Sequence, residues 1–341
     1  MRSSNSSRRP VVCRPPRLAG VTLIELIVVI VISGIIASVL GVIIVRPIEG
    51  YKAQVRRAAL VDAAEMALHR TALDIRQALP NSVRIRDSLG NTNNVTCASA
   101  GVTCAIEMLN TLDGARYREG PGQTAGGHNH ANSAFRLKIN SADSDGFNII
   151  GFFQNIPSLN VSPFTFTSTT ERLAIYNQGV TGADAYADAN APANTPVVMT
   201  NPAVTTFIIR LDGQEDSTAF NDEHQIKPVL GNFRFRWASP NQRVFIVDTP
   251  VTYVCSAGAN GTITRYSNYT ISATQPTNPA VAPLASGSSA LLSTPVTKCA
   301  FSYTPGTNQR AGLVTLDITV QDSASGEQVR LLHQVHVDNA P

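Results

Sequence analysis

The residues of this sequence best suited to chemistry are its five cysteines, Cys13, Cys97, Cys104, Cys255 and Cys299. Cys13 lies in the basic segment at the start of the chain, and the other four form an even set. Four cysteines allow three pairings, and closure of a short loop favours Cys97 with Cys104, which leaves Cys255 with Cys299. No C-x₂-C pair or histidine at ligand spacing points to a metal. The pattern therefore predicts two disulfides in an oxidising, extracytoplasmic compartment.

Two short motifs have some of the features of metal-binding loops. The first, His128 to His130, follows two glycines but has no carboxylate or third ligand nearby, so we interpret it as a solvated loop. The second, Asp143 to Gly146, begins like a calcium loop but lacks the later glutamate that such loops use. A turn that enters a strand at Phe147 is the better interpretation, with calcium binding as the alternative.

The remaining histidines and motifs give little support for catalysis. His333 and His336 lie three positions apart in an expected strand, so they face opposite sides and cannot act as a pair within it. The sequence contains no P-loop, no G-x-S-x-G motif and no paired-carboxylate motif. We therefore expect a protein that is not an enzyme and that has no cofactor and no metal site.

The longest apolar segment of the chain runs from Val21 to Val45 and contains one ionisable side chain, Glu25. As a helix that rises about 1.5 Å per residue, it would extend about 37 Å, enough to cross a bilayer. The segment is therefore predicted to be a membrane anchor. A carboxylate inside a membrane is costly, so Glu25 is expected to have a function and a partner. The alternative is a carboxylate near the headgroups, or one that bonds its own amino terminus one turn away.

A basic segment, residues 1–20, precedes the anchor and ends in Gly20. It carries five arginines and no acid. The rest of the chain has 22 basic and 24 acidic side chains, so its net charge is −2. Nucleic-acid binding is therefore not expected. An arginine pair at positions 8 and 9 and the cysteine at 13 suggest twin-arginine export or a lipoprotein, but residues 10–20 lack the apolar stretch that both require. Because Gly20 precedes the apolar run, cleavage there would leave the helix on the mature protein.

This order of parts, Gly20 followed by Val21 and then by Thr-Leu-Ile-Glu ending at Glu25, resembles the class III leader of type IV pilins and of type II secretion pseudopilins. The sequence departs from the family at Val21, where phenylalanine is usual, and in its long leader of 20 residues. The resemblance implies cleavage after Gly20 and methylation of the new amino terminus at Val21 by a prepilin peptidase in the inner membrane. It also implies that Glu25 pairs with the amino terminus of an adjacent subunit and sets the register of assembly.

Beyond the anchor, residues 46–79 form an amphipathic pattern. Apolar and small side chains recur at spacings of three and four, and charged side chains, Asp74 among them, lie largely off this stripe. The stripe consists of Leu60, Ala64, Leu68, Thr71, Ile75 and Leu79. Pro47 is expected to kink the helix, although a separate soluble helix after Pro47 is the alternative. Pro80 and Asn81 end the pattern, so one helix from residue 21 to residue 79 is predicted.

The rest of the chain, residues 80–341, is predicted to be one antiparallel β-rich domain, because short β-branched and aromatic runs alternate with turn residues. Phe233, Phe235 and Trp237 are expected on one face of a strand. Residues 322–327 are expected to connect the last two strands, residues 313–320 and 329–337, as a hairpin. The predicted fold class is α+β. In the terms of the resemblance it is a type IV pilin-like lollipop, whose long helix has a transmembrane first half and packs on a periplasmic β-rich domain.

Four further runs, residues 70–84, 171–179, 243–255 and 331–339, resemble the MshO type of minor pilin. These proteins belong to the biogenesis of the MSHA (mannose-sensitive haemagglutinin) type IV pilus and are similar to the J-type minor pseudopilins of type II secretion. The resemblance implies a minor pilin in the inner membrane with a periplasmic domain, which then enters a pilus or pseudopilus. The bulk of a domain of about 262 residues favours the tip, where no further subunit lies above it. Its partners would be other pilins or pseudopilins through the N-terminal helix, the prepilin peptidase and inner membrane lipid.

Two alternatives remain open at this stage. One is a J-like minor pseudopilin of a secretion system, and the other is a membrane-anchored adhesin or ligand-binding domain that joins no fibre. The motif from Gly20 to Glu25 disfavours the second alternative, because an anchor alone does not require it.

Overall fold

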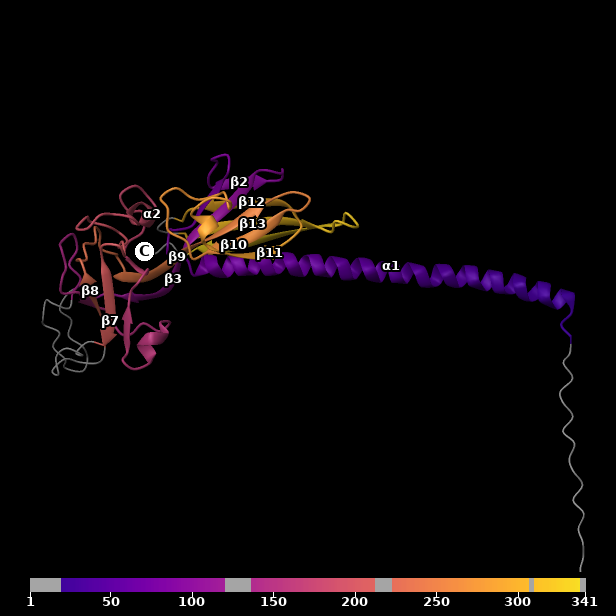
Figure 1. The fold of residues 1–341 in the computed structure, drawn as a ribbon, viewed down its shortest axis with the longest axis horizontal. Helices are drawn as coiled ribbons and strands as arrows, with labels where there is room; N and C mark the ends of the chain where they lie inside the picture. The colour runs from indigo at the N-terminus through magenta and orange to yellow at the C-terminus, as the bar shows by residue number, and fades with distance from the viewer. Residues whose placement is uncertain (1–19, 120–135, 212–222, 307–309, 338–341) are drawn as a thin grey trace, which may run out of the picture. The chain divides into compact units, whose positions relative to one another are not determined.

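The computed structural model describes residues 20–119, 136–211, 223–306 and 310–337. By its internal contacts the chain divides into two compact units, residues 1–56 and residues 57–341. The longest element is helix α1, Leu23–Arg76, which is 54 residues long and contains Pro47 (Figure 1). A break into two helices at Pro47 is therefore absent from the described structure. The first unit contains the apolar part of α1, and the second contains its last turns together with the strands that the structure describes.

The second unit is built mainly from strands. Its short helices are η2 (Pro157–Asn160), α2 (Ala185–Asp188) and η3 (Leu284–Ser286). Its strands are β1 (Arg84–Asp87), β2 (Asn94–Cys97), β3 (Thr103–Arg116), β4 (Phe147–Asn148), β5 (Thr165–Thr167), β6 (Arg172–Ala174), β7 (Thr206–Leu211), β8 (His224–Leu230), β9 (Arg243–Ser256), β10 (Thr262–Ser267), β11 (Ser288–Ser293), β12 (Val296–Thr304), β13 (Gly312–Gln321) and β14 (Gln328–Val337). The long helix and the antiparallel strand pairs agree with the predicted α+β class.

A six-stranded sheet in the order β1-β3-β9-β10-β11, with β6 also paired to β9, forms the centre of this unit. Its two longest strands, β3 and β9, have 14 residues each and run antiparallel. Different parts of β9 contribute to different cores. Tyr253 and Cys255 belong to the core that includes α1, whereas Val244 and Ile246 belong to an aromatic core on the third sheet. The two long strands therefore connect cores that would otherwise be separate.

A second sheet has four strands in the order β14-β13-β12-β2, and we call it the β12–β14 sheet. The predicted hairpin between β13 and β14 is confirmed. In its turn the Asp322 amide donates to the Glu327 carbonyl at 2.9 Å, and the Gly326 amide donates to the Asp322 carbonyl at 2.8 Å. Buried apolar side chains of this sheet share one hydrophobic core with part of the six-stranded sheet, including Met108 and Tyr253, and with Ala64, Leu68 and Ile75 of the α1 stripe.

The third sheet, β4-β8-β7-β5, packs on an aromatic core. Phe147 and Phe233 meet edge to face with ring centroids 5.7 Å apart, and Phe207 is also fully buried. The segment around Phe233 makes only isolated bridges and is not a strand. Trp237 departs from the predicted alternation. It is 50% exposed, and its indole Nε1 donates to the Gly182 carbonyl at 3.3 Å, because the segment leaves the core after Phe235.

Helix α1 ends at Arg76, three residues earlier than predicted. The amide of Ala78 bonds to the carbonyl of Ile75, which tightens the last turn. The amide of Leu79 then donates to the carbonyl of Leu109 at 2.8 Å, so the backbone has left the helix and contacts β3. Leu79 is still buried, as its place in the stripe suggests, although it is no longer helical.

Candidate functional site

The N-terminal end of α1 holds the residues on which the assembly hypothesis depends. The helix begins at Leu23, and the amide of Leu26 bonds to the carbonyl of Thr22, so Thr22 is the N-cap residue. The amide of Glu25 donates to the Thr22 hydroxyl at 3.3 Å, and the amide of Thr22 donates to Glu25 Oε2 at 3.5 Å. This reciprocal pair is a capping box, in which a Thr at the N-cap and a Glu three residues later satisfy amides that the helix leaves free.

The capping box bears directly on the two interpretations of Glu25. In the described chain Glu25 bonds the start of its own helix. This geometry agrees with the alternative interpretation, in which the carboxylate bonds the amino-terminal end of its own helix. One Oε2 contact at 3.5 Å leaves acceptor capacity on the carboxylate, so a second partner can still bind it.

Gly20 and Val21 are open to contact from outside the chain. A Cβ added at Gly20 would meet no atom within 4 Å, and no positive φ requires glycine there. Val21 is 69% exposed. The fold therefore gives no reason for a glycine at position 20, and any requirement for it must come from a molecule that binds this segment.

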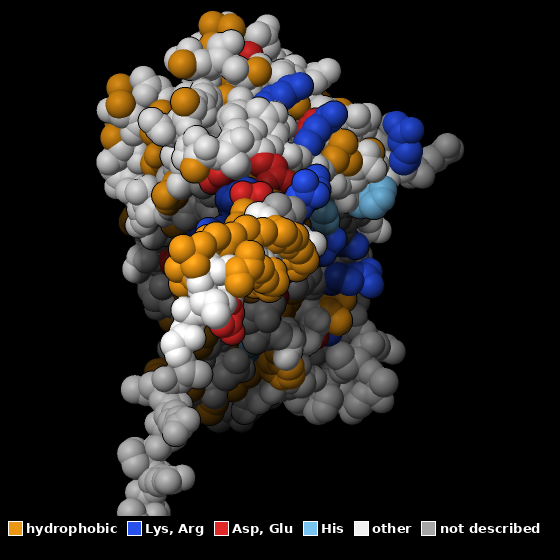
Figure 2. All heavy atoms as spheres, turned by 90° about the vertical axis from the view of Figure 1, so that its right-hand side faces the viewer, with side chains coloured by type: hydrophobic (Ala, Val, Ile, Leu, Met, Phe, Trp, Pro, Cys, Tyr) orange, Lys and Arg blue, Asp and Glu red, His pale blue; other side chains and the backbone are white. Residues whose placement is uncertain are grey.

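The apolar half of α1 exposes its side chains on every side. The described side chains from Leu23 to Val45 are all exposed, and the most apolar 18-residue stretch has a mean hydropathy of 3.1 with none of it buried. Figure 2 shows these hydrophobic side chains as a band of orange spheres on the helix that faces the viewer. Among the described residues, one helix, at the N-terminal end, is long and apolar enough to span a membrane.

The polar half of α1 is held in the second unit by a buried ionic contact. Asp74 is 4% exposed, and its Oδ2 accepts from Arg265 Nε at 2.7 Å and from the Tyr253 hydroxyl at 2.6 Å. Arg70, one turn earlier, lies 3.2 Å from Asp74 Oδ1. Burial and the neighbouring carboxylate both raise the pKa of Tyr253, which keeps the phenol a donor. The helical pattern predicts Asp74 on the solvent side, because its partners Tyr253 and Arg265 lie more than 170 positions further along the chain.

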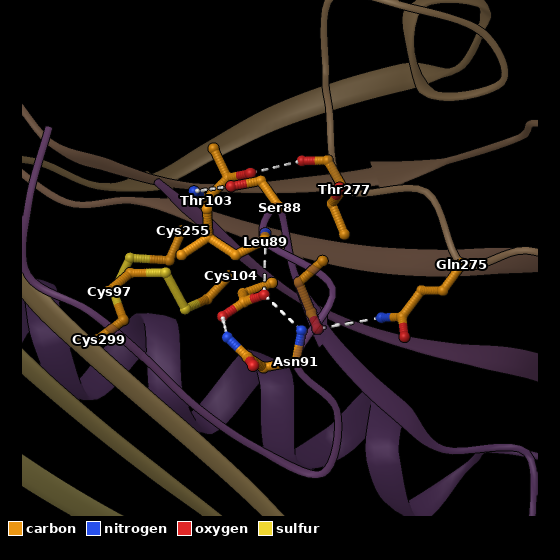
Figure 3. The surroundings of a disulfide bond; sticks show 12 residues. Ser88, Leu89, Asn91, Cys97, Thr103, Cys104, Cys255, Gln275, Thr277 and Cys299 are labelled. Carbon is orange, nitrogen blue, oxygen red and sulfur yellow. Dashed lines mark hydrogen bonds between the residues drawn. A yellow bond between two sulfur atoms is a disulfide. The ribbon is translucent and has the colours of Figure 1, made fainter. Parts of the chain in front are cut away.

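The four described cysteines form one compact cluster (Figure 3). Cys97 is joined to Cys104 and Cys255 to Cys299, the two pairs that loop closure favours. Cys97 in β2 lies opposite Cys299 in β12, and Cys104 in β3 lies opposite Cys255 in β9. Both bonds therefore cross from the β12–β14 sheet to the six-stranded sheet, side by side. All four are at most 1% exposed and belong to the core that includes α1.

A second buried polar group ties surface segments to the six-stranded sheet. Glu107 in β3 is fully buried and accepts from Arg84 Nε at 2.6 Å and from the Tyr269 hydroxyl at 2.9 Å. The other nitrogens of Arg84 donate to the carbonyls of Ser272 and Ala273 at 2.7 Å each. Burial raises the pKa of the Glu107 carboxyl, although Arg84 and Tyr269 favour its charged form. Because these groups satisfy one another inside the protein, they stabilise the fold.

The carboxylates of the calcium-like motif bind other groups of the protein. Asp143 Oδ1 accepts from the amides of Asp145 and Gly146 at 3.2 Å each. The ammonium of Lys138 lies 2.7 Å from Asp145 and 3.6 Å from Asp143. A lysine thus supplies the positive charge between the two carboxylates, and the motif forms a turn before β4.

The other candidates for chemistry do not converge. His128 and His130 lie outside the described residues, His333 is half-buried in β14 and His336 is exposed on the opposite face of that strand. In the described part of the chain, no three His, Cys, Asp or Glu side chains are grouped to hold a metal ion.

A cavity of about 600 Å³ opens where α1 ends. Its lining includes Arg76, Thr111 and Asp113. The carboxylate of Asp113 already accepts from the backbone amides of Gly114, Gln154 and Asn155 at 2.7 Å each. That carboxylate therefore positions a loop, and the geometry does not mark it as a catalytic base.

Comparisons of this chain with protein-family models, with curated proteins and with solved structures found no match.

Proposed function

We propose that this chain is a minor pilin of the MSHA type, made as a precursor, cut after Gly20 and assembled through its N-terminal helix into the tip of a pilus. The observation that carries the proposal is the motif from Gly20 to Glu25 at the head of a fully exposed apolar helix. A simple membrane anchor needs the apolar side chains but neither the glycine nor the glutamate. The capping box accounts for Glu25 within its own helix but not for Gly20, whereas a processing enzyme and an assembly partner account for both residues.

The two halves of α1 support this role together. Its apolar half offers a surface that lipid or neighbouring helices of the same kind can cover. Its other half is built into a disulfide-linked domain through the buried stripe and through Asp74. A subunit of a helical fibre needs this combination, because the helix must move from lipid to a protein bundle while its globular domain stays folded.

We propose that Glu25 has two successive roles, one before cleavage and one after it. In the precursor it caps its own helix through Thr22. Cleavage after Gly20 creates an ammonium at Val21, and in an assembly the ammonium of an adjacent subunit can bind the acceptor capacity that remains on Glu25. Such an ion pair in a low-dielectric environment would align neighbouring subunits.

The size of the globular domain favours a rare subunit at the tip. A domain of about 260 residues has an expected radius of gyration near 18 Å, against about 13 Å for 100 residues. In a fibre with a core of N-terminal helices, a bulky domain fits most easily where no further subunit lies above it. We therefore place this chain at the tip, where it initiates or caps the fibre.

Quantitative mass spectrometry of sheared fibres tests this function. We expect this chain at a small fraction of the most abundant pilin, beginning at Val21 with a methylated amino terminus, and we expect few or no fibres after its deletion. A chain that begins at Met1 in the assembled fibre, or one near parity with the major pilin, would contradict the proposal.

Variants at two positions separate the roles of Glu25. Glu25→Gln keeps the capping box but removes the charge, whereas Thr22→Val removes the cap hydroxyl and keeps the charge. If Glu25 binds a neighbouring ammonium, Glu25→Gln should lose recruitment to fibres and Thr22→Val should retain it. The reverse result would show that Glu25 acts only as a helix cap.

A further inference from the structure

The apolar half of α1 is followed by a short basic segment. Arg46, Lys52 and Arg56 lie within eleven residues, with Glu49 as the one acid among them. We call the three basic residues the collar. All of them belong to the first unit and to the continuous helix α1.

The collar has no partner within the described chain. Arg46 and Lys52 are exposed and Arg56 is half-buried. Among the residues that the structure describes, no ion pair or side-chain hydrogen bond involves any of the three, and Arg56 Nε is shielded without an acceptor. By contrast, Arg57, the next residue, lies 3.6 Å from Glu327. Three cations without an ion pair therefore follow directly after the apolar surface, with Glu49 leaving a net charge of +2 over residues 46–56.

The position of the collar matches the headgroup region of a bilayer. On a helix that rises about 1.5 Å per residue, Lys52 lies about 10 Å beyond Val45 and Arg56 about 16 Å beyond it. Two exposed side chains in the same stretch also suit an interface, since Tyr51 is 68% exposed and Ile48 is 47% exposed. Tyrosines concentrate where hydrocarbon meets headgroups, and basic side chains extend toward phosphates from that depth.

The placement of the collar needs a reason, because positive charge normally marks the cytosolic side of an anchor. The five arginines of residues 1–20 outnumber the collar and can orient the precursor. After cleavage at Gly20 they are gone, and the collar on the far side is the main positive charge next to the anchor. Orientation therefore does not explain why the mature helix carries it.

We propose that the collar binds anionic phospholipid headgroups in the leaflet from which the globular domain emerges. This inference rests on the proposed membrane anchoring of α1 and adds to it the class of lipid. Ammonium and guanidinium groups near an anionic surface gain electrostatic attraction that salt screens. An acidic protein surface is disfavoured as the partner, since the collar begins at the first residue after the apolar run.

Lipid selectivity of the chain from Val21 onward, reconstituted in phosphatidylcholine vesicles, tests the proposal. Omitting residues 1–20 removes the leader arginines from the measurement. Electron spin resonance with trace spin-labelled phosphatidylglycerol or phosphatidylcholine gives the relative association of each lipid with the helix. We expect phosphatidylglycerol to be preferred about fivefold at low salt, and the preference to weaken in 0.5 M NaCl. Inorganic phosphate at equal ionic strength should have no additional effect.

Three variants make the test specific. Arg46→Gln/Lys52→Gln/Arg56→Gln should reduce the preference to about one, and Glu49→Gln should increase it. The matched control Arg76→Gln/Lys298→Gln/Arg310→Gln changes the net charge equally at exposed positions of the second unit and should leave the preference unchanged.

Several outcomes would overturn the proposal. The parent protein could show no preference for phosphatidylglycerol, or the collar variant could keep the preference of the parent protein. The control variant could also lose as much of this preference as the collar variant does. Co-purification of an acidic protein through the collar without lipid preference would also overturn it. Protein that alkaline carbonate extracts from the vesicles would instead contradict the membrane anchoring on which the proposed function rests, so the two failures can be told apart.

Discussion

The two halves of α1 are parts of one helix, but they obtain their stabilising contacts from different sources. From Leu23 to Val45 the described side chains are exposed, and the helix cap at Thr22 and Glu25 is the main local contact. In the second unit the stripe is buried and Asp74 is bonded to Arg265 and Tyr253. The chain itself supplies the contacts of the second region, whereas under the proposed function lipid or other subunits supply those of the first. Substitutions should therefore affect folding in one region and processing or assembly in the other.

The largest effect on folding is expected from the disulfide that closes the longer loop. Cys255→Ala/Cys299→Ala opens a loop of sequence separation 44 and should lower the free energy of unfolding by about 4 kcal/mol. Cys97→Ala/Cys104→Ala, with a separation of 7, should lower it by about 2 kcal/mol. Urea unfolding in detergent, followed by the fluorescence of Trp237, measures both. An equal or reversed order would show that loop closure does not govern their contributions.

Loss of the buried ionic contact should have the next largest effect. Asp74→Asn leaves the guanidinium of Arg265 without its counter-charge and should destabilise the second unit by about 3 kcal/mol. Asp62→Asn, at an exposed position of the same helix, should change stability by less than about 0.5 kcal/mol. If both variants unfolded at the same urea concentration, the contact of Asp74 would not be what holds α1 in place.

A smaller effect should appear on acidification. His224 is buried and its Nδ1 accepts from the Phe153 amide at 3.0 Å, and burial lowers the pKa of this imidazole although the charge of Asp113 opposes the shift. Below the unfolded pKa of about 6.5 the unfolded chain binds a proton that the folded protein does not. Stability should therefore fall as the pH drops from 6.5 toward the lower folded pKa.

The matched variants at histidine positions assign this pH dependence. His224→Asn keeps an acceptor near the Phe153 amide and should flatten the decrease in stability between pH 7 and pH 5. His336→Asn, at an exposed position of β14, should leave the decrease as it is. Urea titrations at a series of pH values measure the slopes, and a parent protein with no decrease would rule out this role for His224.

Substitution of Gly20 should have the smallest effect on folding and the largest effect on processing. Because a Cβ added there would meet no atom within 4 Å and the position is exposed, Gly20→Glu should change the free energy of unfolding by less than about 0.5 kcal/mol. The same variant should accumulate as uncut precursor in membranes, which mass spectrometry of the intact chain would show. Normal cleavage of this variant would contradict the processing hypothesis, and a loss of stability would show that Gly20 contacts the fold.

The parts of the fold predicted correctly from the sequence depend on local patterns. The long apolar helix follows from one continuous apolar run, and the hairpin between β13 and β14 follows from clear alternation on both sides of a turn. The stripe of α1 is visible because helical spacing repeats over many turns. In each case the signal lies within a few neighbouring residues.

The parts that were missed depend on distant residues. Strand β3 shows no alternation because six consecutive residues, from Cys104 to Leu109, are buried on both faces of the sheet, and its Ala, Glu, Met and Leu favour helices. Asp74 appears solvent-facing until Tyr253 and Arg265 are placed beside it. Trp237 follows two buried aromatic residues, yet its segment turns away to contact Gly182. No local pattern contains this information.

The paired disulfides also determine how the protein would behave under a stretching force. The bond between Cys255 and Cys299 encloses 43 residues, which would otherwise extend to about 150 Å when pulled taut. A force applied between the two ends of the chain would bypass this segment, because tension passes through the sulfur atoms. Strands β10 and β11 lie within it, so they would carry no load along the chain even if the rest of the domain unravelled.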